Sequence, residues 1–137
     1  MIQQGATTAF KVSLLNGAQN FTSGVYKIAL YTALADLGPD TTVYTTVGEL
    51  PLAGGYVPGG RTLTNVVPSS SDEVAFISFL NVTWTPASFT ARGALIYNST
   101  TGVAVAVLDF GSDKTCNNTF TVTFPAATAT TAVIRLN

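Results

Sequence analysis

Short runs of β-branched and aromatic residues recur along the whole chain, and clusters of Gly, Pro, Asn and Asp separate them. Strand-like runs at this spacing are typical of an antiparallel β-sandwich. No alternation of strand and helix patterns is present, and no internal repeat or low-complexity linker divides the chain. The sequence therefore predicts an all-β fold, a single antiparallel β-sandwich domain over residues 1–137 with about eight or nine strands. The expected strands cover residues 10–15, 25–32, 42–46, 62–67, 74–84, 88–98, 103–110, 119–124 and 132–136.

The segment at residues 25–32, VYKIALYT, has the most regular strand pattern. Successive side chains of a strand point to opposite faces. Tyr26, Ile28 and Leu30 are therefore expected to share one face, with the intervening residues on the other. Helical structure is expected only at residues 31–37, as a turn or two that the following Gly-Pro pair ends.

The chain is unusually poor in charge. It has 137 residues and a mass of 14.2 kDa, of which 9% are charged and 47% hydrophobic, and its mean hydropathy is +0.38. Soluble domains usually carry about 25% charged residues. Because so little charge favours self-association, we expect neighbours in an assembly to cover part of the exterior, as in a homo-oligomer. Residues 1–9 are expected to form a polar N-terminal arm that orders only on binding.

The charge distribution argues against several kinds of partner. The net charge is −1, the pI is about 5.0, and the six Lys and Arg residues are scattered singly. Binding to nucleic acid or to a membrane surface needs clustered cations, so neither is expected. The apolar runs are shorter than the roughly 20 residues that span a bilayer, and the N-terminus has no signal-peptide pattern. With Cys116 as the only cysteine, an intrachain disulfide is excluded and cytoplasmic synthesis is expected.

Few residues are available for catalysis. The chain contains no histidine, which removes the usual general base near neutral pH. One cysteine without histidine does not supply the ligands of a zinc or iron site. Two carboxylates could still serve a glycosidase, but only Asp109 lies inside an expected strand, and no acid lies in an apolar pattern that would raise its pKa. We therefore expect no catalytic residue, metal or cofactor, and a carboxylate hydrolase is the least favoured alternative.

The glycine-rich stretch at residues 48–61, GELPLAGGYVPGGR, raises the possibility of a phosphate-binding loop. It does not match the P-loop pattern, and the residues that follow it are strand-like rather than helical. Glycine supplies positive φ angles and proline a fixed turn, so the stretch is interpreted as a tight structural loop. Glu49 and Arg61 are expected to pair across its base, with little effect on stability.

The stretch at residues 109–118, DFGSDKTCNN, begins with the metal-binding tripeptide of protein kinases. The kinase assignment also needs a histidine-containing catalytic loop and a far longer chain. The oxygen ligands leave a weak calcium site as an alternative, although the spacing is not that of an EF-hand. Composition favours a polar turn between two strands.

Four N-x-[ST] triplets also occur, and their asparagines are interpreted as turn residues: Asn20, Asn81, Asn98 and Asn117.

Trp84 lies at the end of a strand-like segment and precedes a Thr-Pro pair. A large ring at such a place commonly fills one end of a sandwich core. The alternative is an aromatic platform for a sugar, which Trp84 would form together with Tyr44, Tyr56 and Tyr97. The core position is favoured because large apolar rings are mostly buried.

Several phrases, taken together, resemble a family of small virion proteins of tailed bacteriophages. The phrases are YKIALYT, VYTTVGEL with GGYVPGGR, VTWTPASFTARGALIYN, LDFGSDK and FTVTFPA, and they span nearly the whole chain. Members of the family carry an acid before Val-Thr-Trp, where this chain has Asn81, and this departure weakens any metal role there. The resemblance implies signature residues of the fold and loops, with no catalytic residue: Tyr26, Leu30, Gly55, Tyr56, Gly60, Trp84, Arg92, Tyr97, Phe110 and Phe124.

The resemblance implies a jelly-roll-like sandwich and a structural role in the virion. The expected function is that of a capsid cement or decoration protein on the outer surface of the head, with the major capsid protein as its partner. A homodimer or homotrimer is expected by analogy with decoration proteins. Because similar small sandwiches occur elsewhere in particles, the alternative is a neck, tail or head-fibre component with a receptor-binding or carbohydrate-binding role.

Overall fold

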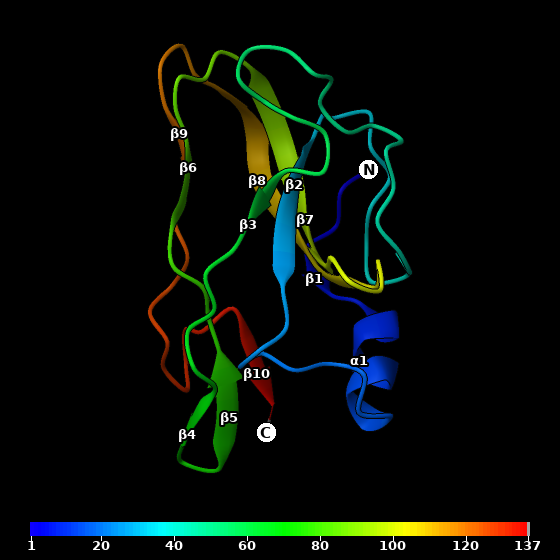
Figure 1. Cartoon of the computed structure of the whole chain (residues 1–137), viewed down its shortest axis with the longest axis vertical. Helices are drawn as coiled ribbons and strands as arrows, with labels where there is room; N and C mark the ends of the chain where they lie inside the picture. The colour runs from blue at the N-terminus through cyan, green and yellow to red at the C-terminus, as the bar shows by residue number, and fades with distance from the viewer. Residues whose placement is uncertain (137) are drawn as a thin grey trace.

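The computed structural model describes residues 1–136, which form one short helix and ten strands (Figure 1). The elements are β1 (Gly5–Ala6), α1 (Thr8–Leu15), β2 (Tyr26–Tyr31), β3 (Arg61–Thr62), β4 (Ser69–Ser71), β5 (Val74–Ile77), β6 (Val82–Trp84), β7 (Thr90–Asn98), β8 (Ala104–Thr115), β9 (Phe120–Val122) and β10 (Ile134–Leu136). All paired strands are antiparallel. The expected all-β class is therefore confirmed.

The main sheet has five strands in the order β1-β8-β7-β2-β3. Its centre is the pairing of β2 with β7, which runs from Tyr26 opposite Asn98 to Tyr31 opposite Gly93. Both segments are rich in apolar and aromatic residues, IALY in β2 and ALIY in β7. Such runs suit a central strand that is buried on both faces.

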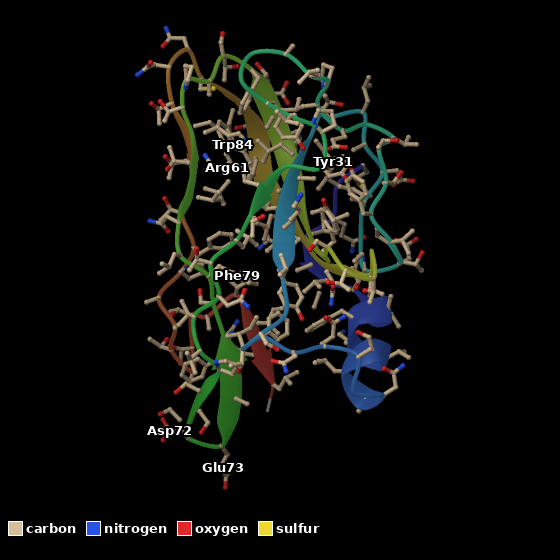
Figure 2. All side chains as sticks on the ribbon, in the orientation of Figure 1. Tyr31, Arg61, Asp72, Glu73, Phe79 and Trp84 are labelled. Carbon is tan, nitrogen blue, oxygen red and sulfur yellow. The ribbon has the colours of Figure 1, made fainter. Side chains whose placement is uncertain are left out.

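A second layer lies beside the main sheet, with β6 and β9 alongside it and β4, β5 and β10 toward its lower end (Figure 1). It consists of a three-stranded sheet, β10-β5-β4, and a two-stranded sheet, β6-β9. The expected strand at residues 74–84 is thus divided into β5 and β6. The hairpin between β4 and β5 turns at Asp72 and Glu73, whose φ angles are +53° and +67°, and Figure 2 shows both residues at one end of the molecule.

Both faces of the main sheet are buried at its centre, where β2 and β7 pair. Tyr26, Ile28 and Leu30 lie in one apolar cluster, between the two layers, as their spacing predicts. The opposite face carries a second cluster that includes Ala29 and Tyr31. Figure 2 shows Trp84 on the side of the sheet that faces β6, and Tyr31 on the side that faces the segment between β2 and β3. This segment, residues 32–60, covers the second face, and we call it the cover loop.

The expected strand at residues 10–15 is wrong, because these residues belong to helix α1. The side chain of Thr7 accepts a hydrogen bond from the Phe10 backbone N–H at 3.0 Å and so caps the helix. Phe10 and Ser13 are buried, at the three-residue spacing that places side chains on one helix face. A capped helix start and this spacing outweigh the strand propensity of the apolar residues.

The expected N-terminal arm at residues 1–9 is packed onto the protein instead. Ile2 is buried in the second cluster and forms a parallel bridge with Leu37. Strand β1 pairs with β8, and Thr7 is fully buried, with its hydroxyl donating to the Ala104 carbonyl at 2.6 Å. Backbone pairing holds this segment, which explains why its side-chain pattern shows no strand period.

Three other expected elements are shorter than predicted or absent. Residues 32–37 form turns rather than a helix, and residues 42–46 contribute only a single bridge between Val43 and Val103. The strand expected at residues 62–67 is reduced to β3 and one bridge at Asn65. No helix within residues 1–136 has the length and apolar character that crossing a membrane requires.

Candidate functional site

The carboxylate of Glu49 organises the glycine-rich loop. One oxygen, Oε1, accepts a hydrogen bond from the Tyr44 hydroxyl at 2.5 Å. The other, Oε2, accepts from the Tyr56 hydroxyl at 2.5 Å and from the Gly59 backbone N–H at 2.7 Å. The expected pairing with Arg61 is wrong, since the guanidinium of Arg61 donates to the Thr83 carbonyl instead. Glu49 therefore holds together three segments of the cover loop.

The tyrosines around Glu49 also attach the loop to the main sheet. The Tyr56 hydroxyl accepts from the Leu30 backbone N–H at 3.0 Å. The Tyr31 hydroxyl donates to the Thr45 carbonyl at 2.6 Å, and the Tyr97 hydroxyl donates to the Gly59 carbonyl at 2.7 Å. We call Glu49 and these tyrosines, with Tyr44, the Glu49 clasp. It provides an acceptor for the backbone N–H of Leu30, which lies on the edge of β2 past the two residues that pair with β3.

Two glycines of the loop lie against backbone. An added Cβ at Gly60 would overlap the Ile28 carbonyl oxygen and lie 2.8 Å from the Ala29 Cα. A Cβ at Gly55 would overlap the Pro86 carbonyl oxygen. Their φ angles are +78° and +90°, a region that side chains other than glycine rarely adopt. The loop is therefore packed against the protein and does not form a cradle open to a phosphate.

Burial raises the pKa of the tyrosines in the clasp. For Tyr31, Tyr44 and Tyr56 the pKa lies well above the ordinary value, and the largest cause is burial of the phenol. The nearby Glu49 carboxylate raises the pKa of all three further. The pKa values of Tyr26 and Tyr97 are raised as well, again mainly by burial. All five tyrosines of the chain therefore share this shift.

We expect the tyrosines to ionise only when the protein unfolds in alkali. Unfolded tyrosines ionise near pH 10, whereas the raised pKa values keep the folded phenols neutral. The folded state is therefore favoured below pH 10. Stability falls above it by about 1.4 kcal/mol per pH unit for each of the fully buried Tyr31 and Tyr56, and by less for the half-buried Tyr44. Phenolate absorbance and circular dichroism, followed together against pH, should change in one step. A phenolate signal near pH 10 in the folded protein would contradict this.

The aromatic residues considered as a sugar platform are packed inside the protein. Trp84 is 3% exposed, Tyr56 is fully buried and Tyr97 is 6% exposed. The Trp84 ring packs edge-to-face on Phe120, with centroids 6.0 Å apart, and Tyr97 stacks on the half-buried Tyr44 at 4.5 Å. The core position of Trp84 is confirmed, and these rings do not form an exposed platform.

The other signature residues lie in or against the two apolar clusters, except Arg92 on β7. The first cluster contains Tyr26, Leu30, Tyr56, Trp84 and Phe124, and Phe110 packs against it. Tyr97 belongs to the second cluster. Arg92 lies on β7 and forms an ion pair with Asp109 of β8 at 3.3 Å.

The stretch expected as a polar turn between strands lies mostly within β8. Arg92 on β7 faces a bulge, since Ala91 pairs with Lys114 and Gly93 with Asp109, and residues 110–113 lie between them. The backbone N–H of Gly111 donates to the Asp109 carboxylate at 2.9 Å. That hydrogen bond is the main cause of the lowered pKa of Asp109, and the Arg92 guanidinium lowers the pKa further. Within residues 1–136, no group of three His, Cys, Asp or Glu residues could hold a metal ion.

The interpretation of the sequon asparagines as turn residues is confirmed at two positions. The side-chain oxygen of Asn20 accepts from the N–H groups of Thr22 and Ser23. That of Asn98 accepts from Thr100 and Thr101 in the same way. At a third sequon, the side chain of Asn81 accepts from the Phe124 N–H across β6 and β9, at 2.9 Å.

Comparisons of the chain with protein-family models, with curated proteins and with solved structures found no match. The functional argument therefore depends on the chain's own residues. The Glu49 clasp is the feature that the sequence pattern missed. Its only signal in the sequence was that Glu49 is the single charged residue between Asp40 and Arg61. The spacing of Tyr44 and Tyr56 along the chain did not indicate that both contact Glu49.

Proposed function

We propose that this chain is a structural subunit of a phage particle, a cement or decoration protein that binds the major capsid protein on the outside of the head. In this proposal the two β-layers form a jelly-roll-like sandwich, and the protein binds without catalysing a reaction. The sequence resemblance described above motivates the proposal. The chemistry of the cover loop supports it.

The supporting observation is a group of exposed apolar side chains on the cover loop. Leu34 is 90% exposed, Val47 75% and Leu52 73%, with Val43 and Val57 also exposed. The single charge of residues 41–60 is Glu49, and the clasp satisfies its carboxylate internally. Residues 41–60 therefore present apolar side chains without an unsatisfied charge, whereas Leu34 lies in the part of the loop that also exposes Asp36 and Asp40. An uncharged apolar surface like that of residues 41–60 is expected of a site that binds another protein.

A neutral contact of this kind suits a subunit present in many copies. Each contact can be modest in affinity, because binding at several neighbouring capsomers adds up. Association through uncharged surfaces changes little with salt, since screening acts on charges. Weak, salt-insensitive and repeated contacts are what a decoration subunit needs.

We expect the double substitution V47D/L52D to abolish binding to undecorated heads while leaving the protein folded. Each change places a carboxylate at an exposed loop position, where the effect on stability is usually within about 0.5 kcal/mol. Burying these charges in an interface would lower affinity by about 100-fold or more. The measurement is co-sedimentation with heads at low and moderate salt, together with thermal unfolding.

The matched control is V12D/L15D, which also introduces two carboxylates, at residues of α1 that are 56% and 91% exposed. It should bind heads as the unchanged protein does. Quantitative mass spectrometry of purified particles should find the chain in a simple ratio to the shell protein. If V47D/L52D binds normally, or if the chain is missing from particles, the proposal fails.

A further inference from the structure

Strand β9 has one edge without a strand partner. It pairs only with β6, in a two-stranded sheet. The carbonyl of Asn118 and the N–H of Phe124 both form hydrogen bonds toward the β6 side. Because backbone groups alternate in direction along an antiparallel strand, those of Thr121 and Thr123 face the other way. No strand within residues 1–136 pairs with this outer edge.

The outer edge of β8 is also incompletely paired. Strand β1 covers it only at Ala106 and Val107. The next outward N–H, that of Asp109, donates to the side-chain oxygen of Gln4 at 3.1 Å. A side chain therefore occupies the place where a further ladder hydrogen bond would lie.

A cavity of about 490 Å³ lies between β8 and β9, and we call it the β8–β9 groove. Its apolar wall includes Leu108, Phe110, Phe120 and Val122. Thr121 of β9 and the flanking Thr119 and Thr123 form part of its polar lining. The rings of Phe110 and Phe120 pack with centroids 6.0 Å apart. The volume lies within the range of known ligand sites, about 300 to 1,000 Å³.

The groove is lined by one acid that forms an ion pair and by one lysine that forms none within residues 1–136. Two charged side chains line it, Asp109 and Lys114. Asp109 is neutralised by the ion pair with Arg92 at 3.3 Å. Lys114 forms no ion pair with any of residues 1–136. An occupant with an acidic residue would supply the missing partner.

We propose that the β8–β9 groove binds an extended, acidic segment of another protein chain by strand addition. The backbone of the segment would pair with the outward groups of Thr121 and Thr123. Its alternate side chains would contact the apolar wall at Phe120 and Val122, and its acid would face Lys114. This site is separate from the cover loop, so it does not depend on the proposed function.

Cys116 provides a direct test, because the only thiol of the chain lines the groove. The probe is a short synthetic peptide of alternating valine and threonine with one central glutamate. Saturating peptide should protect Cys116 from alkylation and slow hydrogen exchange at the amides of Thr121 and Thr123. A peptide with lysine in place of the glutamate should bind about tenfold more weakly.

Three variants test the geometry. T121P removes the outward N–H and should abolish binding. K114E should weaken binding by about tenfold or more, whereas K27E, at a residue of β2 outside the groove, should leave it unchanged. If T121P fails to fold, the comparison of K114E with K27E still shows whether the peptide binds in the groove beside Lys114.

Several results would overturn the proposal. In the first, saturating peptide does not protect Cys116 from alkylation. In the second, K114E binds the peptide as tightly as the unchanged protein does. A further one is Cys116 protection that rises with the concentration of the protein alone, because the groove would then hold a second copy of this chain rather than another protein.

Discussion

The substitution G60A is expected to unfold most of the protein or to destabilise it by more than about 4 kcal/mol. The added methyl group would overlap the carbonyl oxygen of Ile28 and lie 2.6 Å from its carbonyl carbon. Both atoms are backbone of the central strand β2, so neither can move aside as a side chain can. The residue would also keep a φ of +78°, which is strained for alanine. Urea unfolding followed by tryptophan fluorescence measures the loss.

The neighbouring glycine supplies the matched control for this prediction. Gly59 also has a positive φ, +97°, but an added Cβ there would meet only the Tyr97 hydroxyl, at 3.7 Å. G59A should therefore lower stability only by the backbone strain, about 1 to 2 kcal/mol. Equal effects of G59A and G60A would show that the close approach to β2 is not what requires glycine at position 60.

The substitution E49A is expected to lower the free energy of unfolding by about 3 to 5 kcal/mol. It leaves two tyrosine hydroxyls and the Gly59 N–H without their acceptor. A buried donor without a partner costs about 1 to 3 kcal/mol. The loss should appear as a lower midpoint of urea unfolding. It should also speed hydrogen exchange at Leu30, because the Tyr56 hydroxyl that binds its N–H would be released.

Two glutamine variants test whether the carboxylate oxygens of Glu49, rather than the size of its side chain, stabilise the loop. E49Q is the test and E73Q is the control. E49Q keeps the shape but replaces one acceptor oxygen with an NH₂ group, so either Tyr44 or the pair Tyr56 and Gly59 loses its acceptor. A loss of about 1 to 3 kcal/mol is expected. E73Q makes the same change at the exposed tip of the β4–β5 hairpin and should be within about 0.5 kcal/mol of the unchanged protein. If E49A is as stable as E73Q, the clasp does not hold the loop.

The strand pattern of the sequence predicted the centre of the fold. The two-residue alternation in VYKIALYT correctly placed Tyr26, Ile28 and Leu30 on one face, and the apolar run at residues 88–98 correctly predicted β7. These predictions succeeded because side-chain direction along a strand is a local property. The core position of Trp84 followed in the same way from its type and its place at the end of a strand.

Two features of the N-terminal region were not predicted. Helix α1 forms where a strand was predicted, because the Thr7 cap and the burial of Phe10 favour it over local propensity. The cap is a local signal, but the strand-like residues 10–15 outweighed it in the prediction. The N-terminal segment is ordered by backbone pairing with β8, which is about 100 residues away in the sequence, and this contact has no signature in the local pattern.

The sequence by itself determined the all-β class, the orientation of β2 and the lack of histidine chemistry, since each follows from residue type or from neighbouring positions. Only the tertiary structure decided that Glu49 binds Tyr44 and Tyr56 rather than Arg61, and that the partly paired edge of β8 and the outer edge of β9 flank a groove. The physical reason is that the partner of a carboxylate, or of a strand edge, is set by how the whole chain packs in space.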